Sequence, residues 1–328
     1  MKKEILDKIT SASECGEPVS EQTALDILNS KQNDIPDILA SSSRMKQKHF
    51  GNTVHLCSIL NAKSGACPEN CAFCAQSVHH NTNIETYPLK NGHEIANAFN
   101  DAESLPIDHF GVVTSGSCLK ENELDNICKA IRKSKKSEIA WCASLGSLNT
   151  DQFKALKEAG LKRFHHNLET AESFFSEICT THTYKKRLET IRNAKNAGLE
   201  ICCGCIMGIG ETKEQRVELA LTLQRENVNS IPLNFIIPIP GTKLEKIEVM
   251  KPLDIIRCIA MFRMINPKVE IKVCAGRTHL RDLQSMIFHA GATGMMIGDL
   301  LTIAGREVKQ DLQMLDDLEV DYAQRKMD

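Results

Sequence analysis

The chain has 328 residues, of which 42% are hydrophobic and 25% charged, so it is long enough for one large globular domain or two of medium size. A formal net charge of -2 and an aromatic content of 5% provide no basic, aromatic-rich surface, so we expect no nucleic-acid partner. No run is long and apolar enough to span a bilayer, so we expect no membrane partner either.

The first segment of the chain is expected to be helical. The run from Glu21 to Ser30 places apolar residues on one side, as an amphipathic helix does: Ala24, Leu25, Ile27 and Leu28. We therefore expect residues 1–45 to form a helical extension that precedes the main domain.

The rest of the chain alternates β-rich runs with amphipathic stretches. The expected strands are Thr53 to Leu60, His109 to Ser115, Glu138 to Ser144, Lys162 to Leu168, Leu199 to Met207, Ser230 to Ile236, Glu270 to Ala275 and Gly294 to Ile297. The expected helices include Glu121 to Lys135, Thr150 to Ala159, Tyr184 to Ala197, Lys213 to Glu226, Leu253 to Ile265 and Arg281 to Ala290. This alternation predicts an α/β fold, a TIM-type (β/α)8 barrel, over residues 46–305. Residues 306–328 are expected to close the same single domain.

Three cysteines directly follow the first expected strand. Cys67, Cys71 and Cys74 have CxxxCxxC spacing and supply one thiolate fewer than a closed four-iron cluster needs. Such a cluster keeps one iron free to bind a small molecule. The position also suits chemistry, because barrel enzymes place their active sites on the loops that follow the strands.

Other readings of the cysteines stay open. A zinc site could use His79 or His80 as its fourth ligand, although zinc sites usually contain CxxC pairs. Disulfides are not expected, because the run Met1 to Lys8 is charged where a secretory signal would be apolar. We therefore expect the 14 cysteines to belong to a reducing compartment, the cytoplasm.

The cysteine loop, Lys63 to Ser77, resembles the cluster loop of radical S-adenosylmethionine (SAM) enzymes, and most closely that of the biotin synthase family. More segments resemble this family in the same order: His166 to Thr170, Thr183 to Leu188, Gly204 to Thr212, Pro232 to Asn234, Ala275 to Arg277 and Asp311 to Gln313. The resemblance implies a sulfurtransferase that uses a 4Fe-4S cluster and SAM. It would convert dethiobiotin to biotin with sulfur drawn from an auxiliary iron–sulfur cluster. It also implies a homodimer and a low-potential electron donor of flavodoxin or ferredoxin type.

The same resemblance assigns residues to SAM. Asn167 and Glu169, two positions apart, are expected to face one side and to contact its ribose and methionine portions. Arg187 resembles the carboxylate-binding arginine, although spacing alone favours a surface pairing with an acid such as Glu189. Phe73 and Ile206 are expected beside the adenine, and a core position is the alternative for Phe73.

The expected auxiliary site departs from the family pattern. Gly111 stands where a cysteine ligand is expected, and Lys272 where the family has an arginine ligand. Cys142 and Cys202 match the family, and strand alternation directs Cys274 to the same side as Lys272.

We therefore expect Cys142, Cys202 and Cys274 to hold a larger, four-iron auxiliary cluster in place of the usual 2Fe-2S unit, which stays the alternative. Cys205 is a less certain fourth ligand, and Cys118 a weaker reserve. The other interpretation is that the barrel cysteines outside the family pattern are small buried hydrophobic residues that bind no metal.

Substrate contacts are expected at two positions. Asn234 resembles a residue that hydrogen-bonds the ureido ring of the substrate. Thr302 resembles one that holds the substrate carboxylate, and Ile303 stands where the family has a second threonine.

Two alternative functions remain open. The first is a radical mutase or maturase that inserts no sulfur, similar to methylornithine synthase or a hydrogenase maturase. The second is a non-enzymatic iron–sulfur or zinc protein.

Overall fold

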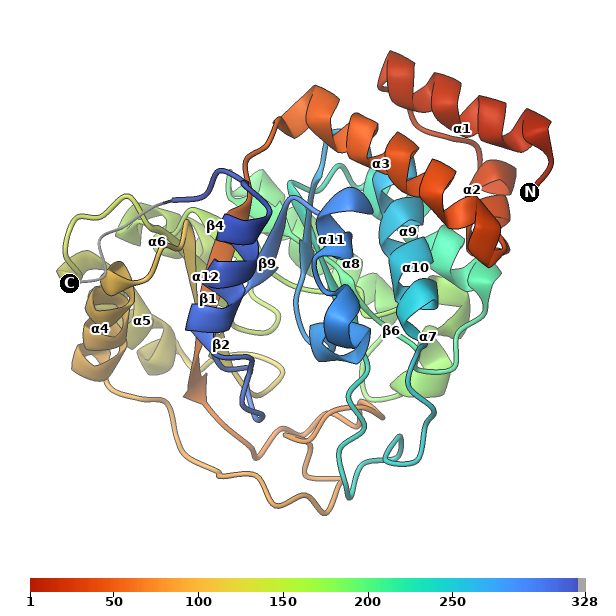
Figure 1. Ribbon diagram of the computed structural model, residues 1–328. Coiled ribbons are helices and arrows are strands. Elements are labelled where there is room, and N and C mark those ends of the chain that lie inside the picture. The colour runs from red at the N-terminus through yellow and green to blue at the C-terminus, as the bar shows by residue number, and fades with distance from the viewer. Residues whose placement is uncertain (324–328) are drawn as a thin grey trace.

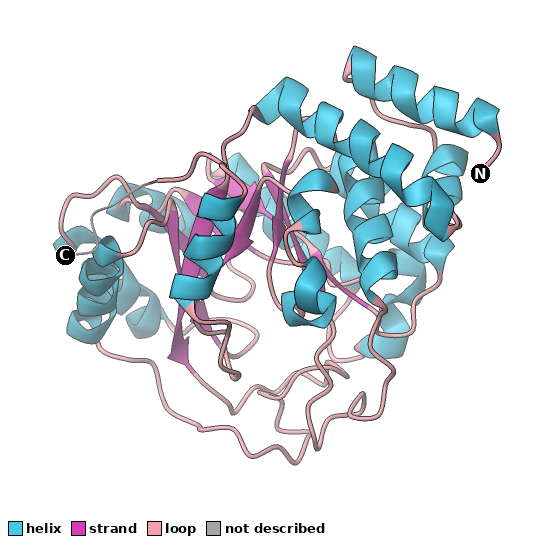
Figure 2. Cartoon of the chain, in the orientation of Figure 1, coloured by secondary structure: helices cyan, strands magenta, loops and turns pink. Residues whose placement is uncertain are grey.

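A single parallel sheet forms the centre of the molecule and is enclosed by helices (Figure 2). The computed structural model describes residues 1–323, so the final part of the segment expected at 306–328 lies outside the described residues. The strands are β1 (His55–Lys63), β2 (His109–Thr114), β3 (Ala140–Ser144), β4 (Arg163–His165), β5 (Glu200–Cys202), β6 (Cys205–Met207), β7 (Ser230–Phe235), β8 (Glu270–Val273) and β9 (Gly294–Met296). Their order is β5-β4-β3-β2-β1-β9-β8-β7-β6, and a pairing of β5 with β7 closes the ring. The expected TIM-type (β/α)8 barrel is confirmed.

One expected strand is divided. The run from Leu199 to Met207 forms β5 and β6 and is interrupted at Gly204. The Gly204 carbonyl accepts hydrogen bonds from the amides of Leu168 and Glu169. A Cβ at Gly204 would lie 1.9 Å from the Pro232 carbonyl oxygen, so the chain approaches its neighbour too closely for any side chain. The two short strands together occupy one position in the barrel.

Helices cover the outside of the sheet, as expected between parallel strands. They are α4 (Gly92–Asp101), α5 (Glu121–Lys133), α6 (Thr150–Ala159), α7 (Glu172–Ile178), α8 (Tyr184–Asn196), α9 (Lys213–Arg225) and α10 (Pro252–Ile265), with a 3-10 turn η2 (Ala102–Ser104) after α4. The helix expected from Arg281 to Ala290 is wrong in its first part. A 3-10 segment, η3 (Arg277–Leu283), precedes a short helix, α11 (Met286–His289), because Arg281 has a φ of 52°, which a helix does not admit.

The N-terminal extension is helical, as expected. It comprises α1 (Lys3–Cys15), α2 (Glu21–Leu28), the turn η1 (Gln32–Asp34) and α3 (Ile35–Phe50). These helices lie along the upper edge of Figure 1, whereas the long loop after β1 runs along the lower edge. Helices α2 and α3 pack against α10 and bury Ile27, Ile38 and Met45. The extension therefore shares its apolar core with the barrel, and α3 continues past the boundary expected at residue 45.

The closing segment contains α12 (Val308–Asp317), which is drawn in front of β1 in Figure 1. Asp311 is fully buried and pairs with Arg277 at 2.5 Å and with Arg306 at 3.0 Å. The Val54 amide also donates to the Asp321 carbonyl at 2.7 Å. These contacts tie both chain ends of the barrel together. Within residues 1–323, no helix has the length and apolar character needed to cross a bilayer.

Candidate active site

The loop that follows β1 carries the cysteine triplet and is fixed by its own backbone. Ser64 and Tyr87 exchange two backbone hydrogen bonds of 3.1 Å, and the Cys67 amide donates to the Gln76 carbonyl at 3.0 Å. Gly65 has a φ of +72°, and a Cβ there would lie 2.3 Å from a threonine side chain of the same loop. The loop therefore needs glycine at this position to bring the cysteines over the barrel mouth.

Two cavities of about 420 Å³ each adjoin this loop. The loop cavity is lined by the whole triplet, Cys67, Cys71 and Cys74, and the barrel cavity extends from Cys74 into the barrel. Both cavities are lined by a shared wall, which consists of Phe73, Cys74, Gln76, Thr114, Ser144, His165, Asn167 and Glu169. Two candidate chemical sites are therefore adjacent and meet along these residues.

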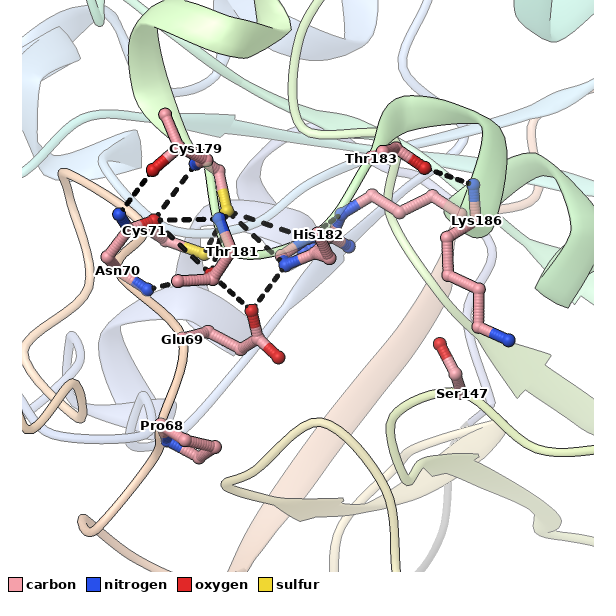
Figure 3. Close-up of polar contacts among 12 residues, drawn as sticks. Pro68, Glu69, Asn70, Cys71, Ser147, Cys179, Thr181, His182, Thr183 and Lys186 are labelled. Atoms are coloured by element: carbon pink, nitrogen blue, oxygen red, sulfur yellow. Dashed lines mark hydrogen bonds and ion pairs between the residues drawn. The ribbon is translucent and has the colours of Figure 1, made fainter.

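A hydrogen-bonded group surrounds one triplet cysteine (Figure 3). Cys71 Sγ lies 3.8 Å from Cys179 Sγ, which lies 3.3 Å from His182 Nδ1. Arg187 Nε donates to His182 Nε2 at 3.0 Å, so the proton of a neutral His182 ring is on Nδ1, 2.7 Å from Glu69 Oε2. A protonated ring nitrogen cannot bind a metal ion. These residues therefore form a hydrogen-bond network around Cys71, and sequence reasoning missed Cys179 and His182.

The triplet thiols are not gathered as closely as a single zinc ion requires among residues 1–323. In that part of the chain, the only three ligand atoms of His, Cys, Asp or Glu that lie within 4.8 Å of one another belong to Cys71, Cys179 and His182, so Cys67 and Cys74 are not part of the group. Of the reserve histidines, His79 Nε2 contacts the Pro68 carbonyl at 3.0 Å, whereas His80 contacts the Cys74 carbonyl through Nδ1 at 2.8 Å and keeps a buried Nε2 without a partner among the described residues. A spread triplet suits a cluster, which binds each thiolate at a separate iron.

The residues expected to hold SAM converge on the shared wall. Arg187 Nη1 lies 3.4 Å from Glu169 Oε1 and donates to the Asn167 carbonyl at 2.8 Å. The side chains of Arg187 and Glu169 are each 12% exposed, so the arginine faces the loop cavity and not the surface acid Glu189. This arrangement fixes a guanidinium and a carboxylate beside the triplet. Such a pair can bind a ligand that carries both a carboxylate and hydroxyl or amino groups.

The expected adenine neighbours lie along the same region. Phe73 belongs to the shared wall, and Ile206 lines the barrel cavity. The Ile206 amide donates to the Glu169 carbonyl at 2.8 Å. Glu169 has a φ of 70°, an unfavourable backbone conformation for a residue with a Cβ, which this bond helps to hold. Strain of this kind is common at binding sites.

The inner part of the barrel cavity is lined by thiols. Cys142 on β3, Cys202 on β5 and Cys274 directly after β8 all line it, as expected from strand alternation. His165 Nδ1 lies 3.4 Å from Cys202 Sγ. Burial raises the pKa of Cys142 to about 12 and that of Cys202 to about 11. These thiols are therefore protonated in the free protein, and metal binding would release their protons.

A further thiol in this cavity was missed. Cys57 lies on β1 and also lines the barrel cavity. A hydrogen bond with Cys274 lowers the pKa of Cys57 to about 7, and the nearby Lys272 ammonium contributes. Cys57, Ser58 and Ile59 all line the cavity, so strand alternation alone does not single out Cys57. Ile59 pairs with Gly111, so the strand that gains this thiol adjoins the strand that lacks the expected cysteine.

Two reserve cysteines are elsewhere. Cys205 is fully buried in the core on the opposite face of its strand from Ile206, so the structure does not bring it to the barrel cavity. Cys203 is likewise a core residue. Cys118 lines the loop cavity instead of the inner thiol group. The structure thus assembles Cys57, Cys142, Cys202 and Cys274, which we call the inner thiol group.

The expected substrate residues line the barrel cavity between the shared wall and the loop after β9. Asn234 Nδ2 donates to the Cys205 carbonyl at 3.0 Å, and its Oδ1 accepts from the Ala275 amide at 3.1 Å. One N–H and one lone pair of its amide remain available to a ligand. Thr302 and Ile303 line the same cavity, so both substrate positions fall in one space.

Comparison with known proteins identifies the family. Residues 62–223 match the Radical SAM superfamily, and residues 232–321 match the Biotin and Thiamin Synthesis associated domain. Biotin synthase of Maridesulfovibrio salexigens is 48% identical over 92% of this chain and 93% of its own length. That of Geobacter metallireducens is 49% identical over 93% and 94%. The chain belongs to the biotin synthase family. The resemblance drawn from the sequence is thereby confirmed, and with it the iron–sulfur and SAM dependence of the biotin synthases.

Solved structures share the fold of this biotin synthase family member. Methylornithine synthase superposes with a TM-score of 0.83 at 16% identity, covering 96% of this chain and 97% of its own. HydG, a maturase of the [FeFe]-hydrogenase, superposes with a TM-score of 0.81 at 15% identity, covering 97% of this chain and 75% of its own. At such low identity these likenesses concern the barrel alone.

Proposed function

We propose that this chain converts dethiobiotin to biotin by SAM-dependent hydrogen abstraction and sulfur insertion. The observation that carries the proposal is the arrangement of thiols. The whole triplet lines the loop cavity, and the inner thiol group lines the barrel cavity that adjoins it at Cys74. A reaction that needs a radical source and a sulfur source around one substrate requires two such thiol groups.

The radical half is assigned to Cys67, Cys71 and Cys74. When bound there, a 4Fe-4S cluster and SAM supply a 5′-deoxyadenosyl radical that removes hydrogen from unactivated carbon. Arg187 would bind the SAM carboxylate through its planar fork, and Glu169, held by Arg187, would accept hydrogen bonds from the ligand. Phe73 and Ile206 would pack against the base and exclude water.

The sulfur half is assigned to Cys142, Cys202 and Cys274, with Cys57 added as the fourth member of the inner thiol group. In place of Cys205, Cys57 is now the reserve fourth ligand. Loss of the thiol at Gly111 and of the arginine at residue 272 argues against the usual 2Fe-2S unit. Within residues 1–323, the inner thiol group offers no three ligand atoms within 4.8 Å of one another, so it suits a cluster and not a single ion. We propose a four-iron auxiliary cluster at this position.

Dethiobiotin would occupy the barrel cavity between these two groups. Asn234 offers both a donor and an acceptor, as a cyclic urea requires. Thr302 would donate to the carboxylate, and Ile303 would contribute apolar contact in place of a second hydroxyl.

Iron and sulfide analysis of the anaerobically reconstituted chain, combined with Mössbauer spectroscopy, tests the cluster assignment. About eight irons per chain are expected, and about six would instead indicate the 2Fe-2S alternative. Cys142→Ala and Cys274→Ala should each lower the auxiliary iron content while preserving the radical SAM cluster. Cys203→Ala is the matched control, because Cys203 lies in the core beside Cys202.

Growth of a biotin synthase-deficient strain on dethiobiotin tests the activity. Rescue is expected from the wild type and Cys203→Ala, but not from Cys67→Ala or Cys142→Ala. If the wild type fails to support growth yet still cleaves SAM under reducing conditions, the mutase or maturase alternative replaces the proposal. Failure of both activities in correctly reconstituted protein would leave the structural iron–sulfur alternative.

We further infer a cytoplasmic, homodimeric enzyme that takes electrons from a flavodoxin or ferredoxin. Free cysteines throughout the chain support a reducing compartment. Sedimentation equilibrium tests the homodimer, and reduction by purified donors tests the electron source.

A further inference from the structure

Two buried cations line the inner part of the barrel cavity beside the inner thiol group. Arg163 lies on β4 and Lys272 on β8, and their side chains are only 6% and 4% exposed. A buried charge is costly unless it is paired or serves a nearby opposite charge. The partners of these two cations therefore indicate what the pair does.

Arg163 is fixed by two carboxylates. Its Nε and Nη2 donate to Glu200 Oε2 at 2.9 and 2.7 Å, and its Nη1 donates to Glu270 Oε2 at 2.7 Å. A further bond of 3.2 Å joins Nη2 to Glu270 Oε1. Because the guanidinium is planar and both of its edges are engaged, its charge cannot move away from the cavity.

Lys272 is held in a similar way. Its Nζ lies 3.6 Å from Glu270 Oε2 and 3.3 Å from His109 Nδ1. Burial, together with the adjacent Lys272 and Arg163, lowers the pKa of His109 to about 2, so His109 is neutral and accepts a hydrogen bond from the ammonium. Lys272 thus stays charged without a dedicated partner of its own, since it shares Glu270 with Arg163.

The two cations face the barrel cavity, whereas the two carboxylates that pair with them do not. Arg163 and Lys272 both line the barrel cavity, whereas neither Glu200 nor Glu270 does. Glu200 is also 32% exposed, so water screens part of its charge. The two cations of this group therefore face the cavity that the inner thiol group lines, and their two carboxylates do not, although the charges of the four residues balance.

We propose that Arg163 and Lys272 form a cationic floor that stabilises the reduced, more negatively charged state of the auxiliary cluster. This inference rests on the proposed function, which places that cluster on the inner thiol group. The two cations act through the field and not by contact with substrate, so they are positioning residues. Fixed positive charge favours electron uptake because each electron adds a negative charge in a site of low dielectric constant.

Potentiometric titration with electron paramagnetic resonance tests the floor on the full chain containing both clusters. In Arg163→Gln, reduction of the auxiliary cluster should become about tenfold less favourable, which is a fall of about 59 mV in its midpoint potential. The radical SAM cluster of the same sample is the internal reference and should keep its midpoint. Arg163→Lys, which retains the charge, should stay close to the wild type, and Lys272→Gln should shift in the same direction as Arg163→Gln.

A charge-balanced double variant separates the field from packing. Arg163→Gln combined with Glu270→Gln removes one positive and one negative charge, so most of the lost midpoint should return. Equal midpoints in the single and double variants, or no shift in Arg163→Gln, would overturn the floor. If Arg163→Gln loses its auxiliary iron, retention of that iron in the double variant supports the charge role, and loss in both overturns it.

The wild type distinguishes failure of the floor from failure of the proposed function. A wild-type chain with about four irons and one midpoint would remove the auxiliary cluster and the floor together. A wild-type chain with both clusters and a charge-insensitive midpoint would remove the floor alone.

Discussion

Arg187 shows how one side chain organises the SAM half of the site. Its Nε bonds His182, its Nη1 bonds the Asn167 carbonyl, and the same nitrogen lies near Glu169. The guanidinium thus links the network around Cys71 to the shared wall. Only a planar fork reaches these groups at once, so lysine cannot replace it.

Arg187→Lys should therefore weaken SAM binding without unfolding the chain. Loss of charge-assisted hydrogen bonds costs about 1.5–3 kcal/mol, so KM for SAM should rise by about ten- to a hundredfold. Steady-state kinetics and circular dichroism are the measurements. Arg192→Lys, on the exposed side of the same helix, is the control, and an equal KM change there would contradict the assignment.

Several site residues could be predicted from the sequence and others could not. The triplet, Asn167, Glu169 and Arg187 have motif positions that matched a known family. Cys57 was missed because it lies outside the matched motifs, and strand alternation does not single it out, since Cys57, Ser58 and Ile59 all line the cavity. Cys205 was retained as a reserve, but it faces the core.

At the scale of elements, Gly204 sets the form of the strand that carries Cys202. Gly204→Ala should destabilise the fold by about 3 kcal/mol, because its Cβ would meet the Pro232 carbonyl oxygen at 1.9 Å. Urea denaturation measures the free energy of unfolding. Gly111→Ala is the control, because its Cβ would meet only the Ile59 methyl group at 3.1 Å. A similar loss in both variants would show that the close approach is not the cause.

The ion pairs between β4, β5 and β8 predict a pH dependence. Lys272 and Arg163 lower the pKa of Glu270 from 4.5 to about 2. A lowered carboxyl pKa stabilises the fold above the ordinary value, and this contribution is lost as the pH falls from 4.5 towards 2. The free energy of unfolding of the wild type should therefore exceed that of Glu270→Gln by about 3 kcal/mol at neutral pH. This difference should vanish near pH 2.

Chemical denaturation of both proteins across this range is the measurement. Glu214→Gln, on the exposed start of α9, is the control and should track the wild type. A difference between wild type and Glu270→Gln that stays constant with pH would contradict the assignment.

Most elements followed from the sequence, and the exceptions have local causes. Alternating β-rich and amphipathic runs predicted the barrel and most of its helices. The strand expected from Leu199 to Met207 is interrupted because Gly204 bonds to residues that follow β4. The helix expected from Arg281 begins late because that residue adopts a positive φ. Both features depend on tertiary contacts or on a single backbone angle, which periodicity does not encode.

At the scale of the whole molecule, the N-terminal extension and the barrel should unfold together. Ile38 in α3 is buried beneath α10, so Ile38→Ala should cost about 2–5 kcal/mol. Trp141, the single tryptophan, lies on β3 and reports on the barrel. In Ile38→Ala, the denaturation midpoint followed by Trp141 fluorescence should fall by the same amount as the midpoint followed by circular dichroism. Gln47→Ala, on the exposed side of α3, should change neither.

Separate midpoints for the two signals would instead make the extension an independent unit. The expected boundary at residue 45 would then mark a true domain limit.

The shared wall has a consequence for the fate of a half-converted substrate. Cys74 and Glu169 line both cavities, so the space beside the triplet adjoins the space beside the inner thiol group. A molecule carrying its first new bond need not leave and rebind before the second reaction. We therefore expect the catalyst to be processive, and a chase with unlabelled dethiobiotin should not dilute intermediates already formed.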